Sequence, residues 1–181
     1  AASDVYKRQA LSTTKESFSL KAWKSLCVDI LTGDHFFSSN CWNLDSWNAI
    51  FAKWIQDDPD KLLELIRKLS AYAGTNAPNI FNWNDTESNA GIMDLKRICY
   101  LLMVCPKDAF IMMGPRLQSQ ISGLLRSTNA ASLKPYIYMM IRVIIITFSE
   151  VHLSTFWPTV YTELEATFQK LLEKLLELKF D

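Results

Sequence analysis

The periodicity of the last stretch, residues 153–178, is the feature that most constrains the fold of this chain. The stretch reads LSTFWPTVYTELEATFQKLLEKLLEL. Its apolar side chains recur at alternating steps of four and three residues, which is the spacing of one stripe along an α-helix. Ser154 suits the N-cap of such a helix, and Pro158 falls in its first turn, where a missing amide costs little. The stripe consists of Trp157, Tyr161, Leu164, Phe168, Leu171, Leu175 and Leu178.

The two halves of this predicted helix point to different roles. The first half, up to Phe168, is expected to face the core. The second half is rich in leucine, and apolar residues flank the stripe, so it offers more apolar surface than one packing face needs. A surplus of this kind, where exposed, is a docking site for a partner helix. The candidate partner-binding residues are Leu171, Leu172, Leu175, Leu176 and Phe180.

Composition favours one soluble-type domain built from helices. The chain has 181 residues, 49% apolar and 21% charged, with only five glycines and six prolines. This length suffices for a hydrophobic core, and the low turn content favours helices over a many-stranded sheet. The formal net charge is zero, with 19 basic and 19 acidic residues. That balance argues against a nucleic-acid binder and against a purely electrostatic membrane binder.

Apolar spacing predicts seven helical segments with short connections. Asp57-Asp58-Pro59 is the sharpest boundary, because Asp58 can cap the helix that follows and Pro59 suits its first turn. The Asn-rich stretch 75–88 is predicted to be an anchored loop. Such segments favour antiparallel helix pairs, as in a fragment of a HEAT-like α-solenoid; a compact helical bundle is the alternative. The segments are 18–31, 44–56, 59–72, 89–104, 107–126 (kinked or split at Gly114-Pro115), 133–149 and 153–178.

The segment 133–149 is apolar almost all round and is predicted to be a central helix, with a strand as the competing prediction. It is too short to span a bilayer. Arg142 interrupts the segment, and a buried guanidinium requires a partner. We expect that partner to be Glu163, which would pack the last helix against this one.

No catalytic or metal-binding constellation is predicted. The four cysteines form no CxxC pair and have no ligand-like spacing with His35 or His152, so they are expected to be reduced and mostly buried. No phosphate-binding glycine loop occurs. We therefore predict no enzyme, no cofactor and no metal. A helical ligand-binding or cytokine-like bundle is the alternative function, and it would normally carry paired cysteines.

The N-terminal residues 4–9, DVYKRQ, look like a translated sequencing adaptor. We therefore expect residues 1–15 to be a disordered or artefactual N-terminus, and residues 16–181 to form a single all-helical domain. On this hypothesis the natural protein extends further toward its N-terminus. A segment cut from a solenoid has an open end, so we expect an exposed apolar face on Phe18, Trp23 and Ile30.

Residues 16–170 resemble the C-terminal region of the Dopey family. The most specific part is HLSTFWPT at 152–159, followed by Glu163-Leu164. The other matching positions are Ser19-Leu20-Lys21-Ala22-Trp23-Lys24, Phe36-Phe37, Trp47, Leu95-Lys96-Arg97 and Arg142-Val143. The Asn-rich loop and the tail after Phe168 depart from the family pattern.

The resemblance implies a non-enzymatic scaffold or adaptor in endosome-to-Golgi membrane traffic. It implies a peripheral protein on the cytosolic face of Golgi and endosomal membranes, associated through partners or other regions. The implied partners are a large Sec7-related Golgi scaffold and an aminophospholipid flippase. The family also has a leucine-zipper-like C-terminal region, which fits the heptad spacing of the last helix.

Overall fold

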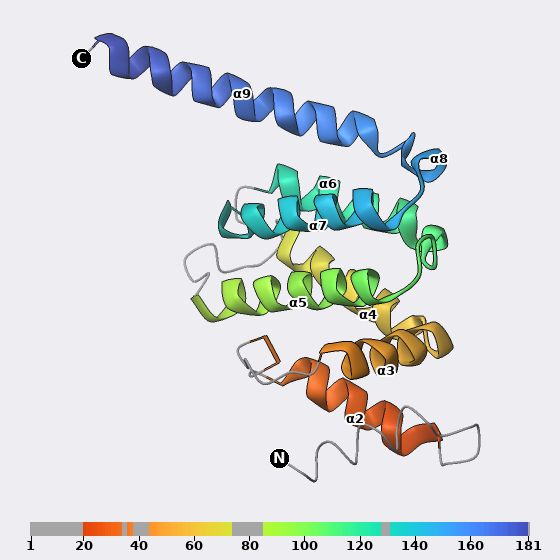
Figure 1. Ribbon diagram of the computed structural model, residues 1–181. Coiled ribbons are helices and arrows are strands. Elements are labelled where there is room, and N and C mark those ends of the chain that lie inside the picture. The colour runs from red at the N-terminus through yellow and green to blue at the C-terminus, as the bar shows by residue number, and fades with distance from the viewer. Residues whose placement is uncertain (1–19, 34–35, 38–43, 74–84, 128–130, 181) are drawn as a thin grey trace.

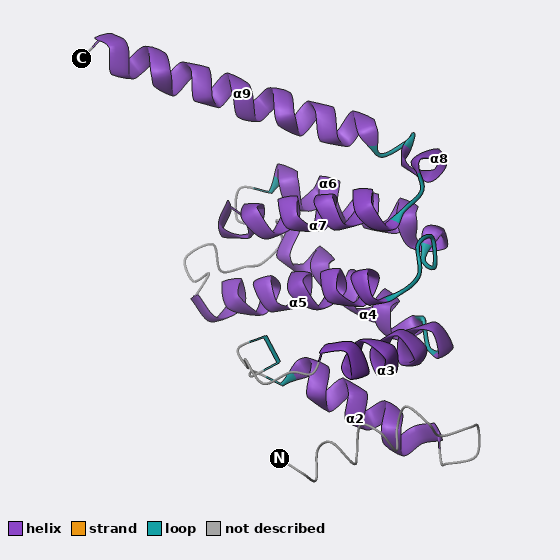
Figure 2. Ribbon diagram, in the orientation of Figure 1, coloured by secondary structure: helices purple, strands orange, loops and turns teal. Residues whose placement is uncertain are grey.

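The computed structural model describes residues 20–33, 36–37, 44–73, 85–127 and 131–180 (Figure 1). Within these ranges all regular structure is helical, which confirms the all-α prediction (Figure 2). The elements are α2 (Leu20–Thr32), α3 (Leu44–Asp57), α4 (Asp60–Ala73), α5 (Asp85–Val104), η1 (Ile111–Met113), α6 (Gly114–Arg126), η2 (Ala131–Leu133), α7 (Lys134–Thr147), α8 (Glu150–Leu153) and α9 (Trp157–Phe180).

The helices are stacked as pairs, as predicted. Helix α2 packs on α3, α4 on α5, and α6 on α7, so that three layers follow one another (Figure 1). The layers are joined by extensive packing of α5 on α7, of α4 on α6, and of α3 on α5. Helix α9 lies over the last layer and has no helix of its own to pair with among the described residues. It meets the stack mainly through α6.

A buried polar network joins the first layer to α5. The carboxylate of Asp94 accepts hydrogen bonds from Tyr72 Oη (3.0 Å) and Arg97 Nη1 (2.9 Å). The same guanidinium donates from Nε to the carbonyl of Leu31 (2.9 Å) and from Nη2 to that of Thr32 (2.8 Å). These are last-turn carbonyls of α2, which lack partners inside the helix. Arg97 therefore caps α2 while its charge is neutralised by Asp94.

Two prolines lie at or next to the helix starts that the sequence predicts, and Phe36 lies in the core. Pro59 immediately precedes α4, and Pro115 lies in the first turn of α6, which begins at the predicted boundary Gly114-Pro115. The first half of the predicted helix 107–126 is wrong, because residues 107–110 form turns and Ile111–Met113 forms only the 3-10 helix η1. Phe36 packs back into the core, with its ring centroid 5.5 Å from that of Phe51 and 5.1 Å from that of Tyr100.

Residues 134–147 form a helix, α7, so the predicted helix is confirmed over the competing strand. The prediction that Arg142 is buried and paired with Glu163 is wrong. The Arg142 side chain is exposed, on a narrow solvent-facing line with Tyr138 and Ile146. Helix α7 belongs to the outermost complete layer, so one edge of it reaches water and the guanidinium needs no buried partner. Glu163 binds elsewhere, as described below.

The open end of the stack is exposed only in part. Trp23 and Ile30 are half-buried and pack against the core, whereas Leu26 on the same helix is 40% exposed. The predictions for residues 1–15, Phe18, His35, Cys41 and positions 75–84 of the predicted loop lie outside the described residues. The last part of that loop prediction, 85–88, is wrong, because these residues form the start of α5.

Candidate functional site

The last helix is set in place by a tight corner after α7. Ser149 donates its backbone N–H to Asp108 Oδ1 (2.6 Å) and its hydroxyl to Asp108 Oδ2. Both hydrogen bonds favour the ionised carboxylate, so they lower the pKa of Asp108 below its ordinary value. Asp108 has a φ of 65°, a left-handed conformation that aspartate tolerates better than most residues. The loop before η1 therefore fixes where α8 begins.

The chain turns once more between α8 and α9. Helix α9 begins at Trp157, and Ser154 ends α8, so the prediction of Ser154 as the N-cap of the last helix is wrong. The turn in between brings Phe156 into the core, where it is only 4% exposed. Gln118 on α6 donates from Nε2 to the carbonyl of Thr155 (2.7 Å) and fastens this turn to the layer below.

The start of α9, which we call its root, is held to the stack by a short buried face and by the carboxylate of Glu163. Phe156 and Val160 are buried against the stack. One turn further on, Glu163 Oε1 accepts hydrogen bonds from Lys134 Nζ (3.2 Å) and Tyr138 Oη (2.7 Å) on α7. Partial burial raises the pKa of the Tyr138 hydroxyl, and its hydrogen bond to Glu163 raises it further. Glu163 thus packs α9 onto α7 as predicted, but through Lys134 and Tyr138 instead of Arg142.

The predicted stripe does not face the core. Tyr161, Leu164 and Phe168 are 64%, 47% and 61% exposed, so the expectation that this half is buried is wrong. With 3.6 residues per turn, the line through these three residues lies about 90° around the helix from the line through Phe156 and Val160. The helix has two adjacent apolar faces, and the stack covers the shorter one.

Beyond this root, α9 projects past the edge of the stack (Figure 1). Every described side chain from Thr167 to Glu177 is exposed. The thirteen residues 168–180 extend about 20 Å at 1.5 Å per residue. We call residues 168–180 the overhang. A helix of this length is marginal in water by itself, so its stability depends on what it packs against.

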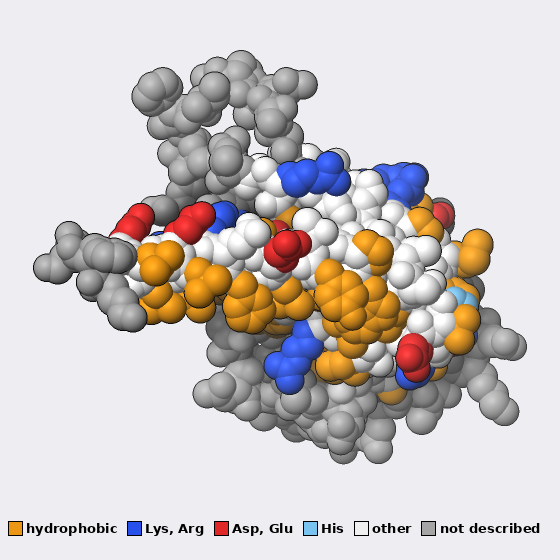
Figure 3. Space-filling model, turned by 90° about the horizontal axis from the view of Figure 1, so that it is seen from above, with side chains coloured by type: hydrophobic (Ala, Val, Ile, Leu, Met, Phe, Trp, Pro, Cys, Tyr) orange, Lys and Arg blue, Asp and Glu red, His pale blue; other side chains and the backbone are white. Residues whose placement is uncertain are grey.

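The predicted partner-binding leucines lie on the overhang and are exposed. Leu171, Leu172, Leu175 and Leu176 are 52%, 59%, 54% and 57% exposed, whereas the side chain of Phe180 lies outside the described residues. Viewed from above, hydrophobic side chains form a row along α9 (Figure 3).

The exposed apolar surface of α9 is large for a single helix. It comprises Tyr161, Leu164, Phe168, Leu171, Leu172, Leu175 and Leu176, which we call the α9 stripe. Given about 150–250 Å² for a large side chain, their exposed fractions amount to on the order of 700 Å². This approaches the ~800 Å² that one partner contributes to a standard protein interface. It also exceeds the 300–600 Å² of the largest patch on a typical monomer.

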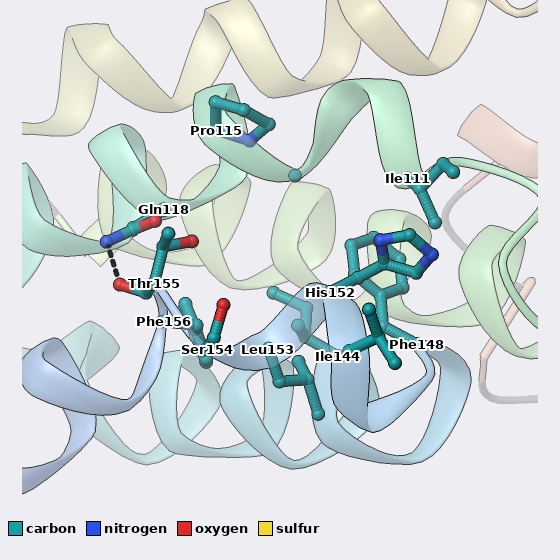
Figure 4. A pocket seen from close by; sticks show the side chains of 12 residues that line it. Ile111, Pro115, Gln118, Ile144, Phe148, His152, Leu153, Ser154, Thr155 and Phe156 are labelled. Atoms are coloured by element: carbon teal, nitrogen blue, oxygen red, sulfur yellow. Dashed lines mark hydrogen bonds between the residues drawn. The ribbon is translucent and has the colours of Figure 1, made fainter.

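A depression of about 270 Å³ lies beside the corner (Figure 4). Gln118 and Thr155 lie at one end, and His152 lies at the other near Phe148. Within the described residues, the His152 imidazole has no hydrogen-bond partner, and Ser154 makes no side-chain hydrogen bond. A nucleophile and a base are therefore not brought together here. The depression is smaller than most ligand pockets, which occupy about 300–1,000 Å³.

Other chemical sites are not found in the described part of the chain. No group of three metal-ligating side chains occurs there. None of the helices described is long and apolar enough to cross a membrane. Cys27, Cys99 and Cys105 are buried and unpaired, as predicted. Burial raises the pKa of Cys27 and of Cys99 to about 12, so neither is a reactive thiolate.

Sequence reasoning missed the residues that anchor α9. Gln118, Lys134 and Tyr138 come from other helices, and nothing in their local pattern pairs them with the last helix. The sequence around the start of α9 does contain one signal of this anchoring. Phe156, Val160 and Glu163 are themselves spaced four and three residues apart, one position before the predicted stripe.

Comparison with known proteins gives a consistent result. A family model described as DOP1 C-terminal matches residues 6–180. The chain is 26% identical over 160 residues to Protein DOP1 homolog of Drosophila melanogaster, and 26% identical over 162 residues to Protein DOP1 of Saccharomyces cerevisiae. It is 28% identical over 161 residues to Protein dop1 of Emericella nidulans. No solved structure matches.

These alignments cover most of this chain and little of each relative. They include 87%, 86% and 80% of the chain, but only 6%, 9% and 8% of the fly, yeast and Emericella proteins. The model match extends beyond residues 16–170, on which the sequence resemblance rests, and it includes the overhang.

Proposed function

The chain belongs to the DOP1 family, also called Dopey, as its C-terminal region, and on this premise we propose that it is a non-enzymatic scaffold in endosome-to-Golgi membrane traffic. It acts through protein–protein contacts. Its location is the cytosolic face of Golgi and endosomal membranes, and its partners include a large Sec7-related Golgi scaffold and an aminophospholipid flippase.

The observation that carries this proposal is the α9 stripe. A projecting helix that leaves on the order of 700 Å² of apolar surface in water is costly unless a partner covers it. The root of α9 is fixed to α6 and α7 by Gln118, Lys134 and Tyr138, so the helix is presented in a defined direction. A rigidly presented apolar helix is one of the recurring modes of protein recognition.

The charges on α9 favour a protein partner over direct insertion into a membrane surface. Over the whole of α9, four glutamates and three lysines (Lys170, Lys174 and Lys179) give a net charge of −1. Helices that lie in the membrane interface usually carry Lys and Arg on their polar face, which anionic lipids attract. Membrane association of this protein therefore depends on partners or on other regions.

Two matched double variants test the proposal. Phe168→Glu with Leu175→Glu places two negative charges seven residues apart on the α9 stripe. Lys170→Gln with Lys174→Gln changes the net charge by the same −2 on the polar face, opposite the α9 stripe. Both variants should keep the helix content and melting temperature of the parent, because none of these four side chains is buried.

The readouts are Golgi localisation by microscopy and co-purification with the Sec7-related scaffold and the flippase. We expect the stripe variant to lose co-purification and localisation by at least tenfold, and the polar-face variant to retain both. Equal behaviour of two folded variants would contradict the assignment of protein contacts to α9. Absence of both proteins from every purification, parent included, would contradict the trafficking role.

A further inference from the structure

The overhang carries two neighbouring rows of leucines. Leu171 and Leu175 continue the heptad spacing of the α9 stripe, and Leu172 and Leu176 form a second row one residue later. All four are exposed to a similar extent, between 52% and 59%. With 3.6 residues per turn, they span an arc of about 140° around the helix.

An arc of this width is more than one partner helix can cover. A two-stranded coiled coil buries a single heptad seam, here the line of Leu164, Phe168, Leu171 and Leu175, which spans about 60°. Leu172 and Leu176 would remain in water beside such a seam. An apolar stripe of 100° or more is instead typical of a helix that packs onto the core of a globular protein, where the surface it covers is wider than a single coiled-coil seam.

The stack itself contains a helix, α5, that is covered by more than one neighbouring helix. Helix α5 packs on α4 within its own layer and on α7 in the next one. From this comparison, we propose that the overhang docks into the groove between two adjacent helices of a partner protein. Leu171 and Leu175 contact one of these helices, and Leu172 and Leu176 contact the other. This inference rests on the proposed function, because it requires α9 to be a protein-docking helix.

The occupant is a helical protein that offers two adjacent helices, which the overhang of a second copy does not. The overhang of a second copy would supply only one helix and would leave one row of leucines uncovered. A lipid surface would cover both rows, but the overhang, with three lysines and two glutamates, has a net charge of only +1, well short of the basic polar face that anionic lipids attract. The groove is therefore apolar along its floor, and its rims are close to neutral.

Photo-crosslinking from single positions tests this geometry. Leu171→p-benzoylphenylalanine and Leu175→p-benzoylphenylalanine probe the first row, and the same substitution at Leu172 and Leu176 probes the second. Glu173→p-benzoylphenylalanine, on the polar face of the same turn, is the control. Each variant is photolysed in a eukaryotic extract that contains cytosol and membranes, and the crosslinked peptides are identified by mass spectrometry.

We expect crosslinks from both rows to one partner protein, with the first row on one helical segment of that protein and the second row on another. The control should give at least tenfold less product. Crosslinks from all four positions to a single helix, or to α9 of a second copy, would overturn the two-helix groove and leave a docking role for α9 intact. Crosslinks to lipid only, or none above the control, would overturn both.

Discussion

Removing the Glu163 carboxylate should loosen α9 without unfolding the stack. In the change Glu163→Ala, α9 loses its hydrogen bonds from Lys134 Nζ and Tyr138 Oη, at 3.2 and 2.7 Å. These bonds hold α9 to α7 little more than one turn before the overhang begins. The buried contacts of Phe156 and Val160 remain. We therefore expect the helix to open locally from Glu163 onward, while α4 to α7 keep their stability.

The magnitude follows from the exposure of the partners. The Glu163 and Lys134 side chains are 17% and 30% exposed, so solvent screens their attraction in part. A hydrogen bond to a charged group contributes about 1.5–3 kcal/mol when well formed, and an exposed ion pair about 0–1 kcal/mol. Tyr138 is 38% exposed and can bond to water after the change, so no buried donor is left unpaired. A local loss of about 1–2 kcal/mol results, which corresponds to a factor of about 5–30 in the opening equilibrium.

Native-state hydrogen exchange measures this effect directly. Amides of residues 163–168 should exchange about 5–30 times faster in Glu163→Ala, and amides of α5 should exchange at the parent rate. The matched control is Glu165→Ala, because Glu165 is exposed and has no hydrogen-bond or ion-pair partner among the described residues. Equal exchange in the two variants would refute the role of Glu163 as an anchor. A uniform increase over the whole chain would show instead that α9 belongs to the global folding unit.

Three further predictions concern the stack and its corner. Asp94→Ala removes the counter-charge of Arg97, whose guanidinium keeps its bonds to the Leu31 and Thr32 carbonyls, and should lower the free energy of unfolding by about 1.5–3 kcal/mol in urea titrations; a loss below about 1 kcal/mol would contradict the role of the network. Hydrogen bonds from Ser149 depress the pKa of Asp108, so their stabilisation is complete above the unfolded pKa and is lost as the pH falls through the lower folded value. The Ser149 amide resonance should therefore stay constant between pH 5 and 8 and shift only below about pH 4; a midpoint near pH 6 would exclude this carboxylate as the cause. With pKa values of about 12, Cys27 and Cys99 should resist iodoacetamide at pH 8 until the protein is unfolded, and rapid labelling of the folded chain would contradict their burial.

The sequence predicts the helices and their pairing well, because both depend on local information. Apolar spacing, Pro59 and Gly114-Pro115 locate helix ends to within a few residues of those observed. Helix α8 was not distinguished from its neighbours, since a four-residue helix contains too little periodicity. The polar contacts were also beyond local information. Arg97 reaches back to carbonyls of α2 that lie 65 and 66 residues earlier in the chain.

Arg142 shows why the position of a helix in a stack cannot be read from its composition. Helix α7 has the composition of a central helix, but only six of its 14 residues are buried. Whether the remaining edge of α7 is buried depends on how many layers of helices pack outside α7. The sequence of α7 does not encode that number. Of the two described helices that follow, α8 forms the corner, and α9 contacts α7 through Lys134 and Tyr138. The edge with Arg142 and Ile146 therefore meets water.

The same reasoning explains the outcome for α9. An inner helix of a stack uses one face for the layer below it and an adjacent face for the helix beside it. The face toward the layer below is the short one that contains Phe156 and Val160. The face for a helix beside α9 lies about 90° around the axis and begins with Tyr161 and Leu164. The heptad spacing of the stripe has the character of a core face, but no described helix of this chain lies beside it. Such a stripe predicts that another helix packs on this face of α9. It carries no information on whether that helix belongs to the same chain.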